Sequence, residues 1–224
     1  METYFASAER TDPETLAAEI ECVSNSPVLS GLLNSIGGLL AVLDANRQIL
    51  AVNDSLLTFL GIDDPGKALG LRPGQVLSCE YADKAPSGCG TTRACATCGA
   101  VIAIVSSLAE DKPVERLCAL KANKGAQTVE LALKVRCQPI QVDGQRFLLL
   151  FLRDVSDDQR RAALERTFFH DINNLLAILL GASEVLLDSQ PSDLSRTVFQ
   201  VAQCLKNEVH LQACLLAGGA GSNT

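Results

Sequence analysis

The hydrophobic pattern of this chain changes at Ser156, and that change constrains the fold more than any other feature. Before it, short apolar runs alternate with Gly-, Pro- and Asp-rich segments, which is typical of strands and short helices. After it, apolar residues recur at spacings of three and four along two stretches, 157–187 and 194–216. This spacing places them on one face of a helix. The sequence therefore predicts an α+β region followed by two long helices.

Five strands are predicted in the first region. They lie near residues 39–43, 48–52, 114–120, 128–142 and 145–155. A polar turn at 44–47 joins the first two strands, Asp143-Gly144 joins the last two, and both turns are typical of antiparallel hairpins. We therefore expect a five-stranded antiparallel sheet.

Short helices are expected before and between these strands. A helix is predicted over residues 11–33, and Pro27 should break or bend it. Asn53 can cap another helix, which Gly61 should end. Residues 101–111 also have helical spacing. The first region therefore predicts a sheet covered by several short helices.

The two long helices are separated by a polar break at 190–193, where Ser192 or Asp193 can cap the second helix. Two helices joined by a short turn form an antiparallel hairpin. Its apolar faces are too wide for a hairpin to bury alone, so we expect a homodimer that completes a four-helix bundle. The Gly- and Ser-rich segment 218–224 has no packing pattern and is expected to be a flexible tail.

Charge and composition restrict the partners and the compartment. The net charge is −7, and nucleic acids require a basic face, so no nucleic-acid partner is expected. The N-terminal residues lack the basic and apolar regions of a signal peptide, and the longest apolar runs are too short to cross a bilayer. Nine cysteines without an export signal point to a reducing compartment. We therefore expect a cytoplasmic protein that does not enter a membrane.

Four of the cysteines, Cys79, Cys89, Cys95 and Cys98, lie within twenty residues. Cys95 and Cys98 form a C-x2-C pair, and this spacing presents two thiolates to one metal from a tight turn. The surrounding segment is rich in Gly, Pro and polar residues, is expected to be loop over 63–92, and offers little core to fill. The cluster therefore predicts a four-cysteine site.

Three interpretations of this cluster are open at this point. The four thiolates can bind a metal, as zinc or as an iron–sulfur cluster. They can also form a reversible dithiol–disulfide switch, or they can be ordinary small buried residues. We favour an iron–sulfur cluster, with zinc as the alternative, because the site lies in the region expected to receive a signal. Cys118 and Cys137 lie in strand patterns and are assigned to the core.

The order of elements over residues 32–155 resembles a PAS sensor domain, with the cysteine-rich insertion at 79–98. Asp154-Val155-Ser156 is similar to the signature by which many PAS domains connect to a signalling helix. The following FFHDINNLLAILLGASEVL resembles the histidine box of bacterial sensor histidine kinases. The resemblance implies a dimerisation and phosphoacceptor hairpin at 156–217, with 1–31 as an N-terminal helical segment. Some similar PAS sensor kinases carry iron–sulfur clusters.

The histidine box contains three residues with roles that its chemistry can explain. His170 and Asn174 share a face of a helix, and Asp171 follows His170 directly. A carboxylate can orient the imidazole for attack on phosphate, and an amide can position a water. By the resemblance, His170 accepts the phosphoryl group, while Asp171 and Asn174 match the acid-x-x-Asn pattern of phosphatase activity. His210 has no such context and is expected to be solvated.

The resemblance as a whole implies a redox- or oxygen-responsive sensor of a two-component system, with a response regulator as its partner. The ATP-binding domain of such kinases should follow the bundle, and none fits after Gly218, so ATP should act only through a separate or missing domain. One alternative is a non-enzymatic PAS interaction module stapled by zinc. Another is a PAS domain that binds a small ligand in its aliphatic interior.

Overall fold

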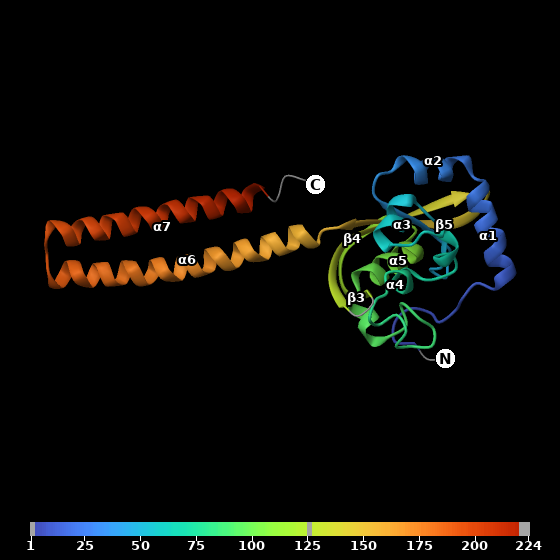
Figure 1. Cartoon of the computed structure of the whole chain (residues 1–224), viewed down its shortest axis with the longest axis horizontal. Coiled ribbons are helices and arrows are strands. Elements are labelled where there is room, and N and C mark those ends of the chain that lie inside the picture. The colour runs from blue at the N-terminus through green and yellow to red at the C-terminus, as the bar shows by residue number, and fades with distance from the viewer. Residues whose placement is uncertain (1–2, 125–126, 220–224) are drawn as a thin grey trace. The chain divides into compact units, whose positions relative to one another are not determined.

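The computed structural model describes residues 3–124 and 127–219 (Figure 1). The chain divides into two compact units, Met1–Asp157 and Asp158–Thr224. The elements are α1 (Pro13–Asn25), α2 (Pro27–Ser35), β1 (Leu39–Leu43), β2 (Ile49–Val52), α3 (Asp54–Leu60), η1 (Pro65–Lys67), α4 (Pro73–Val76), η2 (Arg93–Thr97), α5 (Gly99–Glu110), β3 (Val114–Lys124), β4 (Gln127–Val142), β5 (Gln145–Asp154), α6 (Ser156–Ser189) and α7 (Asp193–Gly219).

The first unit is built on one sheet with the strand order β2-β1-β5-β4-β3, and every neighbouring pair is antiparallel. β4 and β5 are joined by Asp143 and Gly144, whose φ angles of 49° and 79° are those of a two-residue hairpin turn. The turn sets a register in which Val142 pairs with Gln145. The predicted sheet of five antiparallel strands with helices is confirmed.

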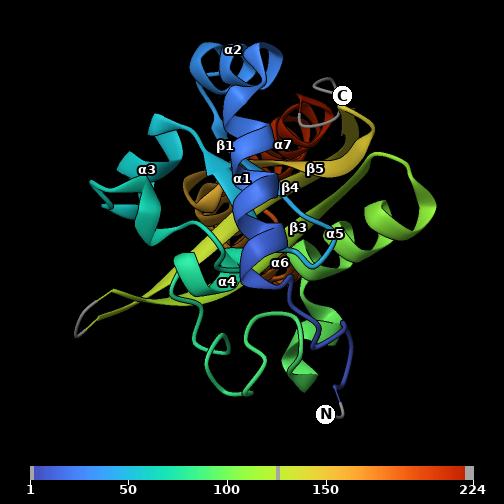
Figure 2. The same cartoon turned by 90° about the vertical axis from the view of Figure 1, so that its right-hand side faces the viewer.

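Alternate residues of the central strands face two apolar clusters, one on each side of the sheet. Leu40 and Leu149 belong to the cluster that includes side chains from α1 and α2. Leu43 and Leu150 belong to the cluster that includes side chains from α3 and α5. Figure 2 shows α1 crossing in front of the strands. The N-terminal helices therefore pack as part of the same unit as the sheet.

The predicted helix boundaries follow from local capping. Ser26 separates α1 from α2, and Pro27 is the first residue of α2, so the proline breaks the expected single helix. Asn53 caps α3 by accepting the N–H of Leu56 at 3.1 Å. Gly61 ends α3 in the left-handed conformation with a φ of 68°, which glycine adopts without strain.

The segment 63–92 was expected to be loop, but it contains the short helices η1 and α4. Each begins with a proline at its first helical position, Pro65 or Pro73, where the missing N–H removes no hydrogen bond. Cys79 forms an isolated antiparallel bridge with Ala122 of β3, and the rest of the segment up to residue 92 consists mostly of turns and bends. The prolines that predicted loop therefore also start short helices.

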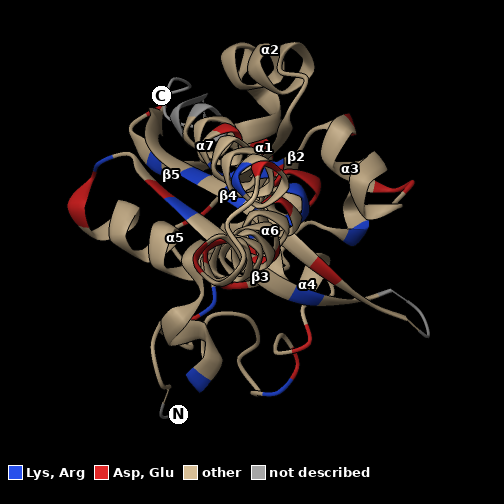
Figure 3. Cartoon of the chain, turned by 90° about the vertical axis from the view of Figure 1, so that its left-hand side faces the viewer, with Lys and Arg blue, Asp and Glu red and all other residues tan. Residues whose placement is uncertain are grey.

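Charged residues of both signs are interspersed along the strands (Figure 3). Lys134 Nζ lies 2.8 Å from a carboxylate oxygen of Glu115 on the neighbouring strand. Lys121 and Glu130 form a similar cross-strand pair at 3.7 Å. These pairs contribute little each because they are exposed to solvent. That nucleic acid is not a partner stays a prediction.

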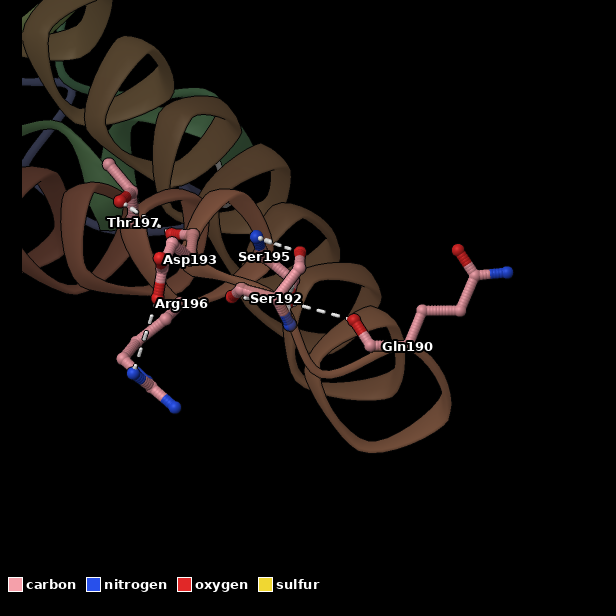
Figure 4. Close-up of polar contacts among 6 residues, drawn as sticks. All are labelled: Gln190, Ser192, Asp193, Ser195, Arg196 and Thr197. Atoms are coloured by element: carbon pink, nitrogen blue, oxygen red, sulfur yellow. Dashed lines mark hydrogen bonds and ion pairs between the residues drawn. The ribbon is translucent and has the colours of Figure 1, made fainter.

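The second unit contains the predicted helical hairpin, whose turn is closed by two serines that cap each other (Figure 4). Ser195 N–H donates to Ser192 Oγ at 3.0 Å, and Ser192 N–H donates to Ser195 Oγ at 2.9 Å. Ser195 Oγ also donates to the Gln190 carbonyl at 2.9 Å. Arg196 pairs with Asp193 in the first turn of α7 at 3.6 Å. The break at 190–193 and the cap at Ser192 are as predicted.

The hairpin leaves most of its large apolar side chains exposed. Among its described apolar residues, Leu176 and Ala202 are buried. The exposed large apolar residues are Leu164, Phe168, Leu175, Ile178, Leu179, Val185, Leu186, Leu194, Val201, Leu205 and Leu211. The wide apolar face is therefore present, while the dimeric four-helix bundle stays a prediction. α7 includes Gly218 and Gly219, and residues 220–224 of the expected tail lie outside the described residues.

Within the described part of the chain, α6 alone is long and apolar enough to cross a membrane, by length and composition only. Each uninterrupted apolar run in the sequence is shorter than a bilayer requires, and α6 is apolar enough only when hydropathy is averaged along the helix. A helix that packs its apolar face on another protein surface has a similar average hydropathy. This composition does not by itself indicate a membrane span.

Candidate functional site

All four clustered cysteines line one cavity of about 210 Å³ in the first unit. Cys79 follows α4, and Cys89 lies in the turns after it. Cys95 belongs to η2, and Cys98 is the residue before α5 at its N-terminal cap. The structure therefore brings together, around one space, the four residues that their spacing predicted.

Two glycines allow the backbone to approach closely around this cavity. A Cβ at Gly74 of α4 would lie 2.6 Å from Cys89 Sγ, and a Cβ at Gly99 would lie 2.0 Å from the carbonyl oxygen of Leu117. Both distances are shorter than van der Waals contact. Glycine at these positions therefore lets α4 approach Cys89 and lets the start of α5 approach β3.

The sheet supplies a fifth sulfur to the same cavity. Cys118 lies in β3 and is fully buried, as its strand pattern predicts, but it also lines the cavity beside Cys98. The two Sγ atoms are 3.7 Å apart. Side chains of three strands complete the sheet side of the cavity, and they include Leu120, Leu133, Leu150 and Leu152. The cavity therefore contacts the core of the sheet directly.

The thiols differ in how readily they lose a proton. The hydrogen bond from Cys118, helped by two backbone N–H groups at the start of α5, lowers the pKa of Cys98 to about 6. The pKa of Cys118 is raised in return. Burial raises the pKa of Cys89 to about 12 and also raises the pKa of Cys79. Metals bind thiolates, so occupation of this site must release protons from the buried thiols.

Arg72 is fully buried beside the cysteine segment. Its guanidinium donates to four backbone carbonyls, those of Glu9, Asn46, Ser87 and Cys89. Burial lowers the pKa of Arg72 to about 10, so the group still carries its charge at neutral pH. The side chain therefore ties three other segments of the chain to its own and places a positive charge next to Cys89.

Arg47 is a second buried arginine at this place. Its side chain donates to the Ser7 carbonyl at 2.6 Å, while its buried Nε has no hydrogen-bond partner among the described residues. Burial lowers the pKa of Arg47, and the nearby thiols of Cys89 and Cys95 act to raise it. A buried N–H without an acceptor costs about 1–3 kcal/mol.

The arrangement of the thiols restricts which kind of metal centre the cysteine cavity can hold. Within residues 3–124 and 127–219, no three His, Cys, Asp or Glu side chains are placed to hold a single metal ion. A tetrahedral zinc–thiolate site needs sulfurs about 3.8 Å apart. Cys98 and Cys118 have that spacing, at 3.7 Å, but the four clustered cysteines surround a larger cavity. The donor set around this cavity is all sulfur, and the choice between an iron–sulfur cluster and zinc stays a prediction.

The second site lies on α6 in the helical hairpin. His170 Nδ1 lies 3.1 Å from Asp171 Oδ1 and 3.4 Å from Asn174 Nδ2. The shorter contact to a carboxylate favours a proton on Nδ1, which leaves the lone pair on Nε2. The side chain of His170 is 71% exposed. The three predicted residues therefore lie together, and the nucleophilic nitrogen is accessible.

His210 on α7 has different surroundings, as expected. It is exposed, and its Nε2 lies 3.9 Å from Cys214 Sγ, one turn further along the helix. A thiol cannot orient the ring as the carboxylate of Asp171 does. The two histidines of the chain are therefore distinguished by their contacts as well as by their sequence context.

Three residues of the cysteine site carry no sequence signal that reveals them. Cys118 has the pattern of an inward-facing strand residue, and Arg47 and Arg72 stand in turn and loop sequences where arginine is usually exposed. Gly99, directly after Cys98, is the one local indication, because a glycine at the start of a helix suggests a close backbone approach. Its partner strand cannot be identified from that glycine alone.

No family model and no curated protein matches this chain. Among solved structures, the chain is similar to the PAS domain of nitrogen regulation protein NR(II) from Vibrio parahaemolyticus, with 15% identity and a TM-score of 0.42 over 58% of this chain and 99% of that chain. It is also similar to the PAS domain of an HTR-like protein from Haloarcula marismortui, with 18% identity and a TM-score of 0.36 over 63% and 92%. A PAS domain from a two-component sensor histidine kinase matches at 11% identity and a TM-score of 0.36 over 55% and 89%. With TM-scores this low, the similarities carry no argument about function.

Proposed function

We propose that this chain is a signal sensor in which a cofactor bound by Cys79, Cys89, Cys95 and Cys98 controls phosphorylation of His170. The observation that carries the proposal is the cavity of about 210 Å³ that all four cysteines line inside the PAS-like unit. A sensing group at this position contacts the sheet core, and the sheet leads directly into α6. The expected compartment is the cytoplasm.

An iron–sulfur cluster is the proposed cofactor. When bound, it would supply one-electron redox chemistry to the sensor. A cluster with four thiolate ligands is anionic, and the buried charges of Arg47 and Arg72 stabilise an anion at this place. These features support an iron–sulfur cluster over zinc.

The route from the cavity to the hairpin runs across one strand. Cys118 and Leu133 pair across β3 and β4, and Leu133 pairs with Asp154 across β4 and β5. The neighbouring Ala132 accepts the N–H of Val155 at 2.8 Å and donates its own N–H to Ser156 Oγ at 2.9 Å. A structural change in the cavity that displaces β4 is therefore passed to the first residue of α6 through two cross-strand residue pairs.

At the other end of this route, the chemistry of His170 is phosphoryl transfer. The Nε2 lone pair attacks the transferred phosphorus, a P–N bond forms, and the bond to the leaving nucleotide breaks. Asp171 keeps the Nδ1 proton in place and offsets the positive charge that develops on the ring. Asn174 is positioned to hold a water for the reverse, hydrolytic reaction on a response regulator. The proposed phosphate source is a separate ATP-binding kinase domain.

The exposed apolar face of the hairpin supports a homodimer. Extensive exposed apolar surfaces usually mark interaction sites. A second copy of the hairpin offers a matching apolar face. A homodimer also gives a separate kinase domain and a response regulator a helical surface on which to dock beside His170.

The cofactor is tested by purifying the full-length protein without oxygen and measuring its absorbance spectrum, iron, sulfide and zinc. We expect a coloured protein that contains iron and sulfide. Cys95→Ser should lose the cofactor, while Cys137→Ser, which changes another buried cysteine away from the cavity, should retain it. A colourless protein that contains zinc would support the stapled interaction module, and a metal-free protein would contradict the metal site altogether.

The phosphoacceptor is tested separately, by adding the ATP-binding domain of a related kinase and labelled ATP. We expect an acid-labile, base-stable phosphate on the chain. His170→Gln should remove all of the label, and His210→Gln should remove none. Label that persists in His170→Gln would show that another residue is the acceptor.

A further inference from the structure

One close sulfur pair at the cysteine cavity consists of a clustered cysteine and a strand cysteine. Cys98 Sγ and Cys118 Sγ are 3.7 Å apart, although the residues are 20 positions apart in sequence. A disulfide has an S–S distance of about 2.05 Å. The two sulfurs therefore need to approach each other by about 1.7 Å to form a bond.

The backbone at this place is suited to such a link. Gly99 lies against β3 so closely that a Cβ there would be 3.3 Å from the Cα of Cys118. The start of α5 and the middle of β3 are thus already in contact in the reduced protein. We propose that Cys98 and Cys118 form an intramolecular disulfide when the protein is oxidised.

The surroundings of the two sulfurs assign their roles. Cys118 is fully buried in the sheet, whereas Cys98 is partly accessible. Cys98 is therefore the sulfur that an oxidant meets first, and Cys118 is the resolving thiol.

The chemistry balances with a hydroperoxide as the oxidant. The Cys98 thiolate attacks hydrogen peroxide, an S–O bond forms, the O–O bond breaks, and the hydroxide that leaves takes up the proton that Cys98 released and becomes water. The Cys118 sulfur then attacks the sulfenic sulfur of Cys98, the S–S bond forms, and the S–O bond breaks. The departing oxygen takes the proton of Cys118 and leaves as water. Two electrons pass from the two thiols to one peroxide, which becomes two waters.

The disulfide regulates the cofactor site, and this part of the inference rests on the proposed function. Cys98 cannot ligate a cofactor and bond to Cys118 at the same time. Oxidation therefore yields a cofactor-free protein with α5 pinned to β3. A reductant that restores both thiols restores the ability to bind the cofactor.

The test is a disulfide map of the full-length protein after treatment with one equivalent of hydrogen peroxide, both cofactor-loaded and after removal of metal with a chelator. Trypsin places Cys95 and Cys98 in one peptide, 94–116, and Cys118 in another, 117–121. We expect mass spectrometry to find these peptides joined and dithiothreitol to separate them. The link should persist in Cys95→Ser and disappear in Cys98→Ser.

Free thiols at both positions, or a link from Cys118 to a residue other than Cys98, would overturn the inference. The disulfide map is made on the wild-type protein, so this outcome does not depend on whether any variant folds. Iron and sulfide are measured on the loaded sample before peroxide is added. A protein that contains no iron at that point but forms the link would contradict the proposed cofactor and leave the disulfide intact. Bound iron and sulfide before treatment, followed by no link in the chelated sample, would contradict only the disulfide.

Discussion

The two units of this protein differ in how far their apolar side chains are buried. In the first unit, both sides of the sheet are covered, and core residues such as Leu40 and Leu148 are fully buried. In the hairpin, the buried side chains include Ala202, while Leu175 and Ile178 are 67% and 70% exposed. The first unit therefore completes its own core, and the hairpin requires another surface to complete one.

The functional groups follow the same division. The cysteines surround a cavity inside the first unit, where the proposed cofactor would contact the core of the sheet. His170 lies on the exposed surface of α6, where two other proteins can reach it in turn. A sensing group needs a closed environment and a phosphoacceptor needs an open one, so the contrast in packing matches the contrast in proposed roles.

The largest expected effect concerns the closed unit. Arg72→Met leaves four backbone carbonyls without their donor, and we expect it to lower the free energy of unfolding of the first unit by about 3 kcal/mol. Both tyrosines, Tyr4 and Tyr81, lie in that unit, so tyrosine fluorescence in urea reports its unfolding alone. Arg93→Met, at an exposed position of the same segment, should change the value by less than about 0.5 kcal/mol. Equal effects of the two variants would contradict the organising role of Arg72.

The next effect concerns the open face of the hairpin. Leu175 and Ile178 share a face of α6, and changing both to Glu should weaken the proposed homodimer at least about 100-fold, or about 2.7 kcal/mol. Burying two carboxylates of like charge against a second copy is unfavourable. Sedimentation equilibrium measures the dissociation constant. Val28→Glu, at a position that is 71% exposed in α2, is the control and should not change it. A wild-type protein that is monomeric at micromolar concentration would refute the dimer.

A smaller effect separates the two reactions expected at His170. Asn174→Ala removes the amide beside the ring, and we expect dephosphorylation of a response regulator to slow about tenfold, or about 1.4 kcal/mol. Phosphorylation of His170 should change less than about twofold, because Asp171 still orients the ring. Asn173→Ala removes a neighbouring exposed amide and should alter neither rate. Equal loss of both reactions in Asn174→Ala would show that the amide supports the fold of the helix instead.

The smallest effect concerns the connection between the units. Ser156→Ala removes the acceptor for the N–H of Ala132, and we expect the first unit to lose about 1 kcal/mol of stability by tyrosine fluorescence. Ser35→Ala removes an exposed hydroxyl that donates to a helix carbonyl, and it should have no measurable effect. If Ser156→Ala leaves stability unchanged, the start of α6 is not held by β4.

Most of the elements could be predicted from the sequence because their determinants are local. Asn53 and Gly61 bound α3, Pro27 divides the first helices, and Asp143-Gly144 sets the register of β4 and β5. The spacing of His170, Asp171 and Asn174 is a helical spacing, so one correct helix prediction brings them together. The same holds for the hairpin, whose break at 190–193 caps its own second helix.

Only the tertiary structure determines the contacts between residues that are far apart in the chain. A strand pattern shows that Cys118 faces inward, but the packing of α5 on β3 determines that it faces Cys98. The burial of Arg47 and Arg72 depends on four segments that converge around them, and their own neighbours in sequence are typical of exposed turns. Local hydrophobic periods specify which face of an element is buried, whereas the partner of that face is chosen by how whole surfaces fit together.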